Sequence, residues 1–185
     1  MKFLILSGNP KKDGLCKSVE NEIVRGAQDG GAEVSALTME KLDRCRVCGT
    51  GWGICREQHR CAFGGDGFDD AQAAVRAADA VCMITPTYWG EMAEGLKCFL
   101  DRFRRCEFGG NGALSGKQVL IVASPGGSGN GLLSCLDQLD RFCRNTGAVI
   151  FDHIGVNRWN SDYKKECAYK AARAVAEGRK NGDTV

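Results

Sequence analysis

Short apolar runs alternate with longer amphipathic stretches from one end of the chain to the other. Apolar or alternating runs bounded by Gly, Pro or Asn predict five strands, at 1–7, 32–39, 80–85, 117–124 and 148–156. Apolar residues that recur every three or four positions predict five helices, at 15–29, 68–78, 91–103, 131–143 and 162–180. Strands that alternate with helices form right-handed crossovers, so the pattern predicts an α/β fold with a parallel sheet covered on both faces.

The chain has the size of one domain. Its 185 residues and 43% apolar composition suit a single well-packed unit, 1–185, with an end at 180–185 that we expect to fray. A cysteine-rich insert, 43–68, interrupts the alternation after the second predicted strand. The net charge is only +2 and no basic stripe is present, which argues against nucleic acid and anionic membrane as partners. The first apolar run is too short for a signal peptide, so we expect a cytoplasmic protein.

Three loops follow predicted strands, at the edge where such sheets bind ligands, at 7–16, 86–92 and 124–131. The first leads into a helix, so its amides, with Lys11 or Lys12, suit a phosphate; it lacks the G-x-G-x-x-G spacing, and Asp13 stands where a Walker A loop needs Gly. A plain polar turn is the alternative.

The second and third loops suit a flat ligand. Tyr88 and Trp89 come directly after a buried strand, with Gly90 allowing close backbone approach. The third loop, "SPGGSGNG", offers many backbone N–H groups and little bulk. The alternatives are aromatic rings that simply pack under a helix, and a glycine-rich connector with no ligand.

Two of these loops carry motifs of a known family. The stretch "PTYWGEMAEGLKCFLDRF" resembles P-x-Y-[FW]-x-x-[MP]-x-x-x-[LM]-K-x-[FL]-[ILF]-D-R, and 8–16 resembles G-S-P-R-x-x-[GS]-N-T. Over about 1–156 the chain is similar to the NADPH-dependent FMN reductase family, in its iron-sulfur flavoprotein branch. The resemblance implies a flavodoxin-like, doubly wound five-stranded sheet of order 2-1-3-4-5, with the insert after strand 2.

The resemblance also implies which residues meet FMN. The first loop would contribute Ser7, Asn9, Lys11, Gly14, Leu15 and Cys16. The second would contribute Pro86, Thr87, Tyr88, Trp89, Gly90 and Met92, and the third Ser124, Pro125, Gly126 and Gly127.

The first loop departs from the family pattern. Asn9, Lys11 and Cys16 replace Ser, Arg and Thr, so hydroxyl donors and a bidentate guanidinium are lost and weaker FMN affinity is expected. Cys16 sits at a helix N-terminus beside lysines, an environment that lowers the pKa of a thiol. We expect it to line the phosphate pocket.

The insert gathers soft metal ligands. Four of the eleven cysteines follow the spacing Cys45-x2-Cys48-x6-Cys55-x5-Cys61, which suits a [4Fe-4S] cluster or zinc, while unligated packing thiols remain an alternative. The branch carries a compact C-x2-C-x2-C-x4 to 7-C motif here, whereas this chain has Gly51 at the third position. Trp52, among glycines, would form an apolar lid over a cluster.

The other cysteines and both histidines predict no chemistry. Cys82, Cys98, Cys135 and Cys143 fall beside core residues and are expected to act as small hydrophobes. Cys106 and Cys167 lack clustered partners in the sequence. No triad surrounds His59 or His153, so no side chain is assigned a catalytic role.

The resemblance implies an enzyme in which NAD(P)H passes hydride to FMN and the flavin reduces a quinone, a flavin or another small acceptor. One alternative is a non-enzymatic electron carrier or redox sensor that exchanges electrons with a ferredoxin-like protein. The other is a zinc-stabilised α/β binding module without flavin. Members of the family commonly form homodimers or homotetramers, and the insert is a candidate for their interface.

Overall fold

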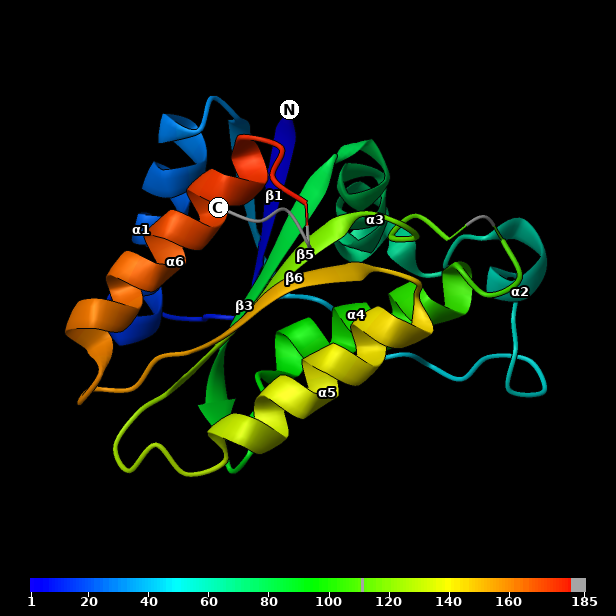
Figure 1. Cartoon of the computed structure of the whole chain (residues 1–185). Helices are drawn as coiled ribbons and strands as arrows, with labels where there is room; N and C mark the ends of the chain where they lie inside the picture. The colour runs from blue at the N-terminus through cyan, green and yellow to red at the C-terminus, as the bar shows by residue number, and fades with distance from the viewer. Residues whose placement is uncertain (111, 181–185) are drawn as a thin grey trace.

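The computed structural model describes residues 1–110 and 112–180, and one sheet lies at its centre (Figure 1). Five parallel strands lie in the order β2-β1-β3-β5-β6. Their bounds are Lys2–Ser7 (β1), Glu33–Thr38 (β2), Ala80–Tyr88 (β3), Gln118–Pro125 (β5) and Val149–Gly155 (β6). Counted among the parallel strands alone, this is the order 2-1-3-4-5, so the predicted flavodoxin-like fold is confirmed. A short antiparallel strand, β4 (Glu91–Met92), adds to the edge of β3.

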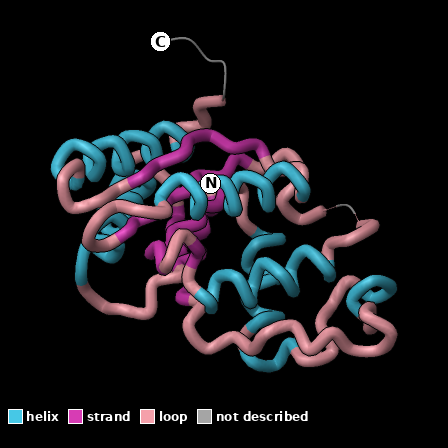
Figure 2. Tube along the Cα trace, turned by 90° about the horizontal axis from the view of Figure 1, so that it is seen from below, coloured by secondary structure: helices cyan, strands magenta, loops and turns pink. Residues whose placement is uncertain are grey.

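Helices cover both faces of the sheet. Their bounds are Gly14–Asp29 (α1), Cys55–Gln58 (α2), Phe68–Ala77 (α3), Glu94–Cys106 (α4), Leu132–Asn145 (α5) and Ser161–Ala176 (α6). α1 and α6 lie on one face, and α3, α4 and α5 on the other (Figures 1 and 2). Each face therefore has its own apolar core, with side chains of each strand alternating between the two.

The strands at the centre of the sheet are buried on both faces. β1 is apolar from Phe3 to Leu6, and β3 and β5 are buried along nearly their whole lengths, as parallel strands under two helix layers must be. β2 and β6 lie at the edges and keep exposed positions. The carboxyl ends of β1, β3 and β5 are thus held side by side, where the three ligand loops leave the sheet.

Predicted boundaries differ from the structure by a few residues, as in the closing helix, which ends at Ala176 and not at 180, and two differences concern the second ligand loop. β3 does not stop at Thr85 but continues through Pro86 to Tyr88. β1 ends at Ser7, which pairs with Ile84, so β3 has no β1 neighbour beyond Ile84. Pro86 lacks a backbone N–H, but no hydrogen bond to β1 is lost there, because β1 has already ended. The predicted helix at 91–103 begins only at Glu94, and Met92 lies in β4 rather than on a helical stripe.

The insert, 43–68, lies between β2 and α3 and contains α2 and a 3-10 turn, η1 (Gly64–Asp66). In Figure 1 it extends away from α1 and α6. Of the C-terminal segment expected to fray, 181–185 lies outside the described residues. Within the described part of the chain, no helix combines the length and apolar character needed to cross a membrane.

Candidate functional site

A tight hairpin places Trp89 at the carboxyl edge of the sheet. Tyr88 pairs with Glu91 and Thr87 with Met92, which leaves Trp89 and Gly90 as a two-residue turn. Both have positive φ, 51° and 84°, as a type I′ turn requires. Glycine adopts this conformation freely, but for a bulky residue such as Trp89 it is strained. The indole is fully exposed at the tip, and strain of this kind is typical of ligand sites.

The hairpin forms one wall of an open slot. This slot has a volume of about 400 Å³ and is lined by Thr87, Tyr88, Trp89, Pro125, Gly126, Gly127, Ser128, Gly129 and Asn130. The first six of these were expected to meet FMN. Pro86, Gly90, Met92 and Ser124 do not line the slot, and neither do the first-loop residues.

The base of the slot is fixed by close backbone contact. A Cβ atom at Gly131 would overlap the backbone of Gly90, so only glycine lets the hairpin approach the start of α5 this closely. The side chain of Gln138 donates to the Gly90 carbonyl at 3.2 Å. The sequence reasoning did not single out Trp159, whose ring lies close to Gly129 from the loop after β6. Its only sequence signal is an aromatic residue in the loop that follows a strand.

Ser124 presents a buried hydroxyl beside the slot. It lies in β5, next to Pro125 and paired with Pro86, and the residue is 4% exposed. Its Oγ has no hydrogen-bond partner among the described residues. Because a buried hydroxyl without a partner costs free energy, this atom is a candidate to bond a ligand.

The first loop uses its polar side chains to hold its own backbone. The Asn9 side chain accepts from the Lys11 amide at 3.2 Å and donates to the Lys11 carbonyl at 2.9 Å. The Ser7 hydroxyl donates to Glu20 at 2.6 Å. Lys11 and Lys12 are exposed, and α1 begins without a side-chain cap. The first backbone amides of α1 and the two ammonium groups can therefore bind an anion.

Cys16 does not have the environment expected from the sequence. The residue is buried on α1, and burial, with the nearby Glu20 carboxylate, raises the pKa of its thiol to about 12. The expectation of a lowered pKa is therefore wrong, because desolvation outweighs the helix terminus and Lys17. Glu20 itself was missed. The available signal was a carboxylate on the apolar face of a helix, between Cys16 and Ile23.

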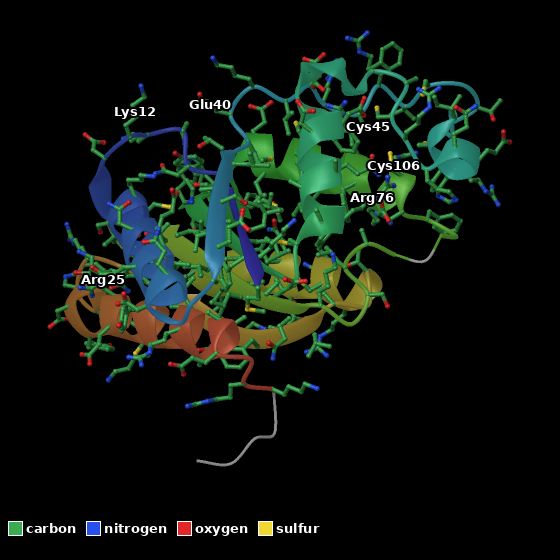
Figure 3. The ribbon with its side chains drawn as sticks, turned by 90° about the horizontal axis from the view of Figure 1, so that it is seen from above. Lys12, Arg25, Glu40, Cys45, Arg76 and Cys106 are labelled. Carbon is green, nitrogen blue, oxygen red and sulfur yellow. The ribbon has the colours of Figure 1, made fainter. Side chains whose placement is uncertain are left out.

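The four insert cysteines line one hollow, together with a fifth thiol. This cysteine hollow, about 20 Å³, is bounded by Cys45, Cys48, Cys55, Cys61 and Cys106, with Arg46, Ala62, Phe63, Arg102 and Arg105. Cys106 comes from the end of α4, and Figure 3 shows it near Cys45 in the insert region. The view that Cys106 lacks clustered partners is therefore wrong, since the fold adds them from far away in the sequence.

The chemistry of the donors suits a thiolate-bound metal group. Five thiols line the hollow and no carboxylate or imidazole does. Burial, then Cys61 and Cys55, raise the pKa of the Cys106 thiol to about 12. Among the described residues no three His, Cys, Asp or Glu side chains stand close enough to hold a metal ion, so ligand binding would have to draw the thiols together.

Trp52 lies beside the cysteine hollow rather than in its lining. Its ring packs against Phe108, with centroids 5.1 Å apart, and the guanidinium of Arg105 lies 5.0 Å from its centroid. Arg105 also donates to the Gly51 carbonyl at 2.6 Å, which ties this part of the insert to α4. The hollow thus has an aromatic and cationic flank.

Four further cysteines lie in the cores, as the sequence predicts, and His59 makes one contact that bears on the insert. Cys82, Cys98, Cys135 and Cys143 are buried in the cores, where burial raises the pKa of each thiol. His59, in the insert, contacts the end of α4, since its Nδ1 lies 2.9 Å from the Cys106 carbonyl.

Curated relatives match most of this chain. An iron-sulfur flavoprotein of Methanosarcina thermophila is 32% identical over 136 residues, which are 71% of this chain and 66% of that protein. Another, from Archaeoglobus fulgidus, is 27% identical over 131 residues, 68% of this chain and 56% of that protein. The matched region thus spans less than two thirds of these relatives.

A solved structure and a family profile agree with the fold. The NAD(P)H:quinone oxidoreductase from Methanothermobacter marburgensis superposes with a TM-score of 0.70 at 16% identity, covering 100% of this chain and 98% of that one. At this identity the likeness shows the fold alone. The sequence profile of the NADPH-dependent FMN reductases matches residues 1–160. The chain belongs to the NADPH-dependent FMN reductase family.

Proposed function

We propose that this protein is an FMN-dependent oxidoreductase that takes reducing equivalents from NAD(P)H and passes them to a quinone, a flavin or another small acceptor. The observation that carries the proposal is the slot at the carboxyl ends of β3 and β5. One wall carries the fully exposed indole of Trp89, whose backbone is strained, and the other is a glycine-rich loop. Beside the slot lies the buried Ser124 hydroxyl, which has no hydrogen-bond partner among the described residues. Family membership supports FMN as the ligand.

Each part of the site has a task in this proposal. Bound FMN would supply the hydride and electron chemistry. Tyr88 and Trp89 would hold the flat ring from one side, and 125–130 would offer backbone to its edge. The amides at the start of α1, with Lys11 and Lys12, would hold the phosphate. Ser124 would donate its hydroxyl to the ligand, and no side chain is required as an acid or base.

We also propose that the cysteine hollow binds a [4Fe-4S] cluster through Cys45, Cys48, Cys55 and Cys61, in preference to zinc. An all-thiol lining suits either group. The names of the curated relatives favour the cluster. A cluster at this place would handle single electrons.

A second candidate function is electron carriage between proteins without NAD(P)H turnover. It is favoured by the apolar side chains exposed around the hollow, Val47, Trp52, Phe63 and Phe108, interleaved with Arg46, Arg56 and Arg105. A surface of this kind suits an acidic partner such as a ferredoxin-like protein. Slow oxidation of NADH and NADPH beside fast exchange with ferredoxin would select it.

Assembly is part of the proposal. We infer a homodimer or homotetramer in the cytoplasm, with the insert at an interface near a neighbour's flavin. Cross-linking with mass spectrometry tests this. Cross-links between copies should include residues of 43–68, and a protein that stays monomeric at all concentrations contradicts it.

The experiment that tests the function is purification under strict anaerobiosis. One sample is analysed for absorbance, flavin identity, iron, zinc and sulfide, and then for oxidation of NADH and NADPH with quinone and flavin acceptors. The proposal requires FMN, about four irons per chain and turnover. A colourless protein with stoichiometric zinc refutes it.

The variant Cys48→Ser separates the two groups. We expect it to lose the iron absorbance and keep its flavin, because the slot and the hollow share no lining residue. Cys167→Ser, at an exposed position on α6, is the control and should retain both. Loss of flavin and iron together in Cys48→Ser would mean that the insert is needed for folding.

A further inference from the structure

Arg102 is the largest fully buried side chain of the protein as described. It lies in the last turns of α4 and is 2% exposed. Its guanidinium carbon lies 4.3 Å from the centroid of the Phe68 ring, at the start of α3. A buried charge is unfavourable unless its hydrogen bonds are satisfied, so the partners of this side chain show what it holds.

The principal partner is Asp66, at the end of the insert. Arg102 Nη1 and Nη2 donate to the two carboxylate oxygens, at 2.6 and 3.0 Å. Burial acts to raise the pKa of the carboxyl, but hydrogen bonds from Arg102 and the Asp43 amide outweigh it, and the pKa of Asp66 lies below its ordinary value. The pair is a bidentate fork, the geometry that only arginine provides.

The same two nitrogens also hold the backbone at both ends of the insert. Nη1 donates to the Asp43 carbonyl at 3.0 Å, and Nη2 to the Phe63 carbonyl at 2.8 Å. The Asp66 carboxylate closes the ring, because it accepts from the Asp43 amide at 2.8 Å. One side chain of α4 therefore joins the segment that enters the insert to the segment that leaves it.

Arg102 also contacts the cysteine hollow directly. Nη2 lies 3.5 Å from the sulfur of Cys61, within range of an N–H···S hydrogen bond. Arg102 is one of the residues that line the hollow. An N–H donor of a guanidinium whose charge is balanced by Asp66 thus meets one of the proposed ligand sulfurs, from a helix outside the insert.

We propose that Arg102 is the positioning residue of the cysteine site: it closes the insert at 43 and 63–66, sets the position of the Cys61 sulfur, and raises the reduction potential of the group that the thiols bind. The last element rests on the cluster assigned under the proposed function. An N–H group that donates to a ligand sulfur stabilises the reduced, more negative state of a thiolate-bound group, and Arg102 can donate in this way even though Asp66 balances its charge. Lysine would keep the charge but could not satisfy Asp66, Asp43 and Phe63 together.

The test compares Arg102→Met and Arg102→Lys with Arg104→Met. Arg104 is exposed on the same helix, and its substitution by Met removes the same charge. Hydrogen exchange of the insert amides, 43–68, is measured in the protein as purified. The midpoint potentials of the iron group and the flavin are then measured by anaerobic spectroelectrochemical titration of one sample.

In Arg102→Met we expect insert amides to exchange at least tenfold faster and the iron group to become harder to reduce, with the flavin potential unchanged. Arg102→Lys should give intermediate exchange and retain part of the potential. Arg104→Met should match the wild type in both. If Arg102→Met fails to fold, the hydrogen exchange and the iron potential of Arg102→Lys test the proposal instead.

Wild-type exchange and wild-type potential in Arg102→Lys, or in a folded Arg102→Met, would overturn the proposal. A wild-type protein that takes up no iron would instead overturn the cluster assignment. The exchange comparison, which needs no metal, still decides whether Arg102 closes the insert. The failure of one proposal is thus distinguishable from the failure of the other.

Discussion

Asn9 stands where the family pattern has serine, and its amide is engaged within the first loop. It bonds both backbone groups of Lys11, while Ser7 is engaged by Glu20. Two residues expected to meet FMN therefore shape the loop that would contact it. Under the proposed function, backbone amides with Lys11 and Lys12 would take the role of the side chains lost from the family pattern.

Gly53 controls the position of the Cys48 thiol. A Cβ atom at this position would overlap the Cys48 sulfur. The backbone of Gly53 is not in the left-handed region, so alanine can be accommodated once the thiol rotates away. We expect Gly53→Ala to lower iron per chain towards the level of Cys48→Ser, with little change in thermal stability.

The matched control for this prediction is Gly65→Ala, also in the insert, where a Cβ would meet no atom within 4 Å. Iron and sulfide analysis after anaerobic reconstitution is the measurement. Full iron in Gly53→Ala would mean that Cys48 is not held at the position that the structure gives.

Packing of α1 against α6 depends on a single missing side chain. Gly26 is buried in α1, and a Cβ there would overlap the backbone carbonyl of Tyr169 in α6. In Gly26→Ala the helices must separate, at a cost of about 1 to 3 kcal/mol, against a gain of about 1 kcal/mol in helix propensity. We expect a net loss of up to about 2 kcal/mol in the free energy of unfolding, measured with urea.

Asn21→Ala, at an exposed position of the same helix, is the control. It gains helix propensity and meets no neighbouring helix, so its stability should be equal to that of the wild type or slightly higher. A Gly26→Ala protein that is more stable than the wild type would contradict the prediction, because separating the helices would then cost less than the gain in helix propensity.

Elements with strong periodicity could be predicted from the sequence, and short ones could not. The parallel strands and the helices α1, α3, α4, α5 and α6 were all expected, with boundaries off by a few residues. β4 has two residues and α2 has four, too few for a period to show. The only sequence signal for the hairpin is the dipeptide Trp89-Gly90. This signal is weak, because a bulky residue such as Trp89 adopts a positive φ only where tertiary structure holds it there.

The candidate site likewise contains features that the sequence predicts and features that it does not. Loops that follow strands could be located because topology fixes where strand ends lie. Neighbours that are distant in sequence could not be located, which is why the partners of Cys106 and the position of Trp159 were missed. Glu20 differs, since a carboxylate on the apolar face of a helix was a signal that the sequence offered. The pKa of Cys16 was misjudged for a related reason, since the depth of burial is a property of the whole fold.

Across the whole molecule, α4 connects the two candidate sites. The hairpin that forms the slot leads directly into its first turn, and Arg102, Arg105 and Cys106 of its last turns line the cysteine hollow. Its 13 residues make a rod of about 20 Å. Slot and hollow are therefore held at a fixed separation by one rigid element (Figure 1).

Stability at acid pH should depend on Asp66. Its folded pKa is lowered, so its contribution is fully present above the ordinary aspartate value and is lost as the pH falls through the folded value. We expect Asp66→Asn to reduce the free energy of unfolding by about 2 kcal/mol at pH 7, because a hydrogen bond to a charged group is lost. The difference should shrink at acid pH, as the pH falls below the ordinary aspartate value and through the lower folded value, because the wild-type carboxyl then also becomes protonated.

Urea unfolding at neutral and at acid pH measures this effect. Asp101→Asn is the control, since Asp101 pairs with Lys97 on the same face of α4 but is half exposed, and exposed pairs contribute at most about 1 kcal/mol. A gap between Asp66→Asn and the wild type that stays constant with pH would contradict the assignment.

The closure at the base of the insert makes that segment a replaceable module. Since Arg102 and Asp66 hold its two ends together, the positions of those ends do not depend on the path and length of the chain between them. Doubling the length of a loop with fixed ends costs only about 0.6 kcal/mol. Such a segment can lengthen or shorten over evolution without disturbing the framework. The wider spacing between Cys48 and Cys55 is then a variation within the module, and another loop with the same ends could be transplanted in its place.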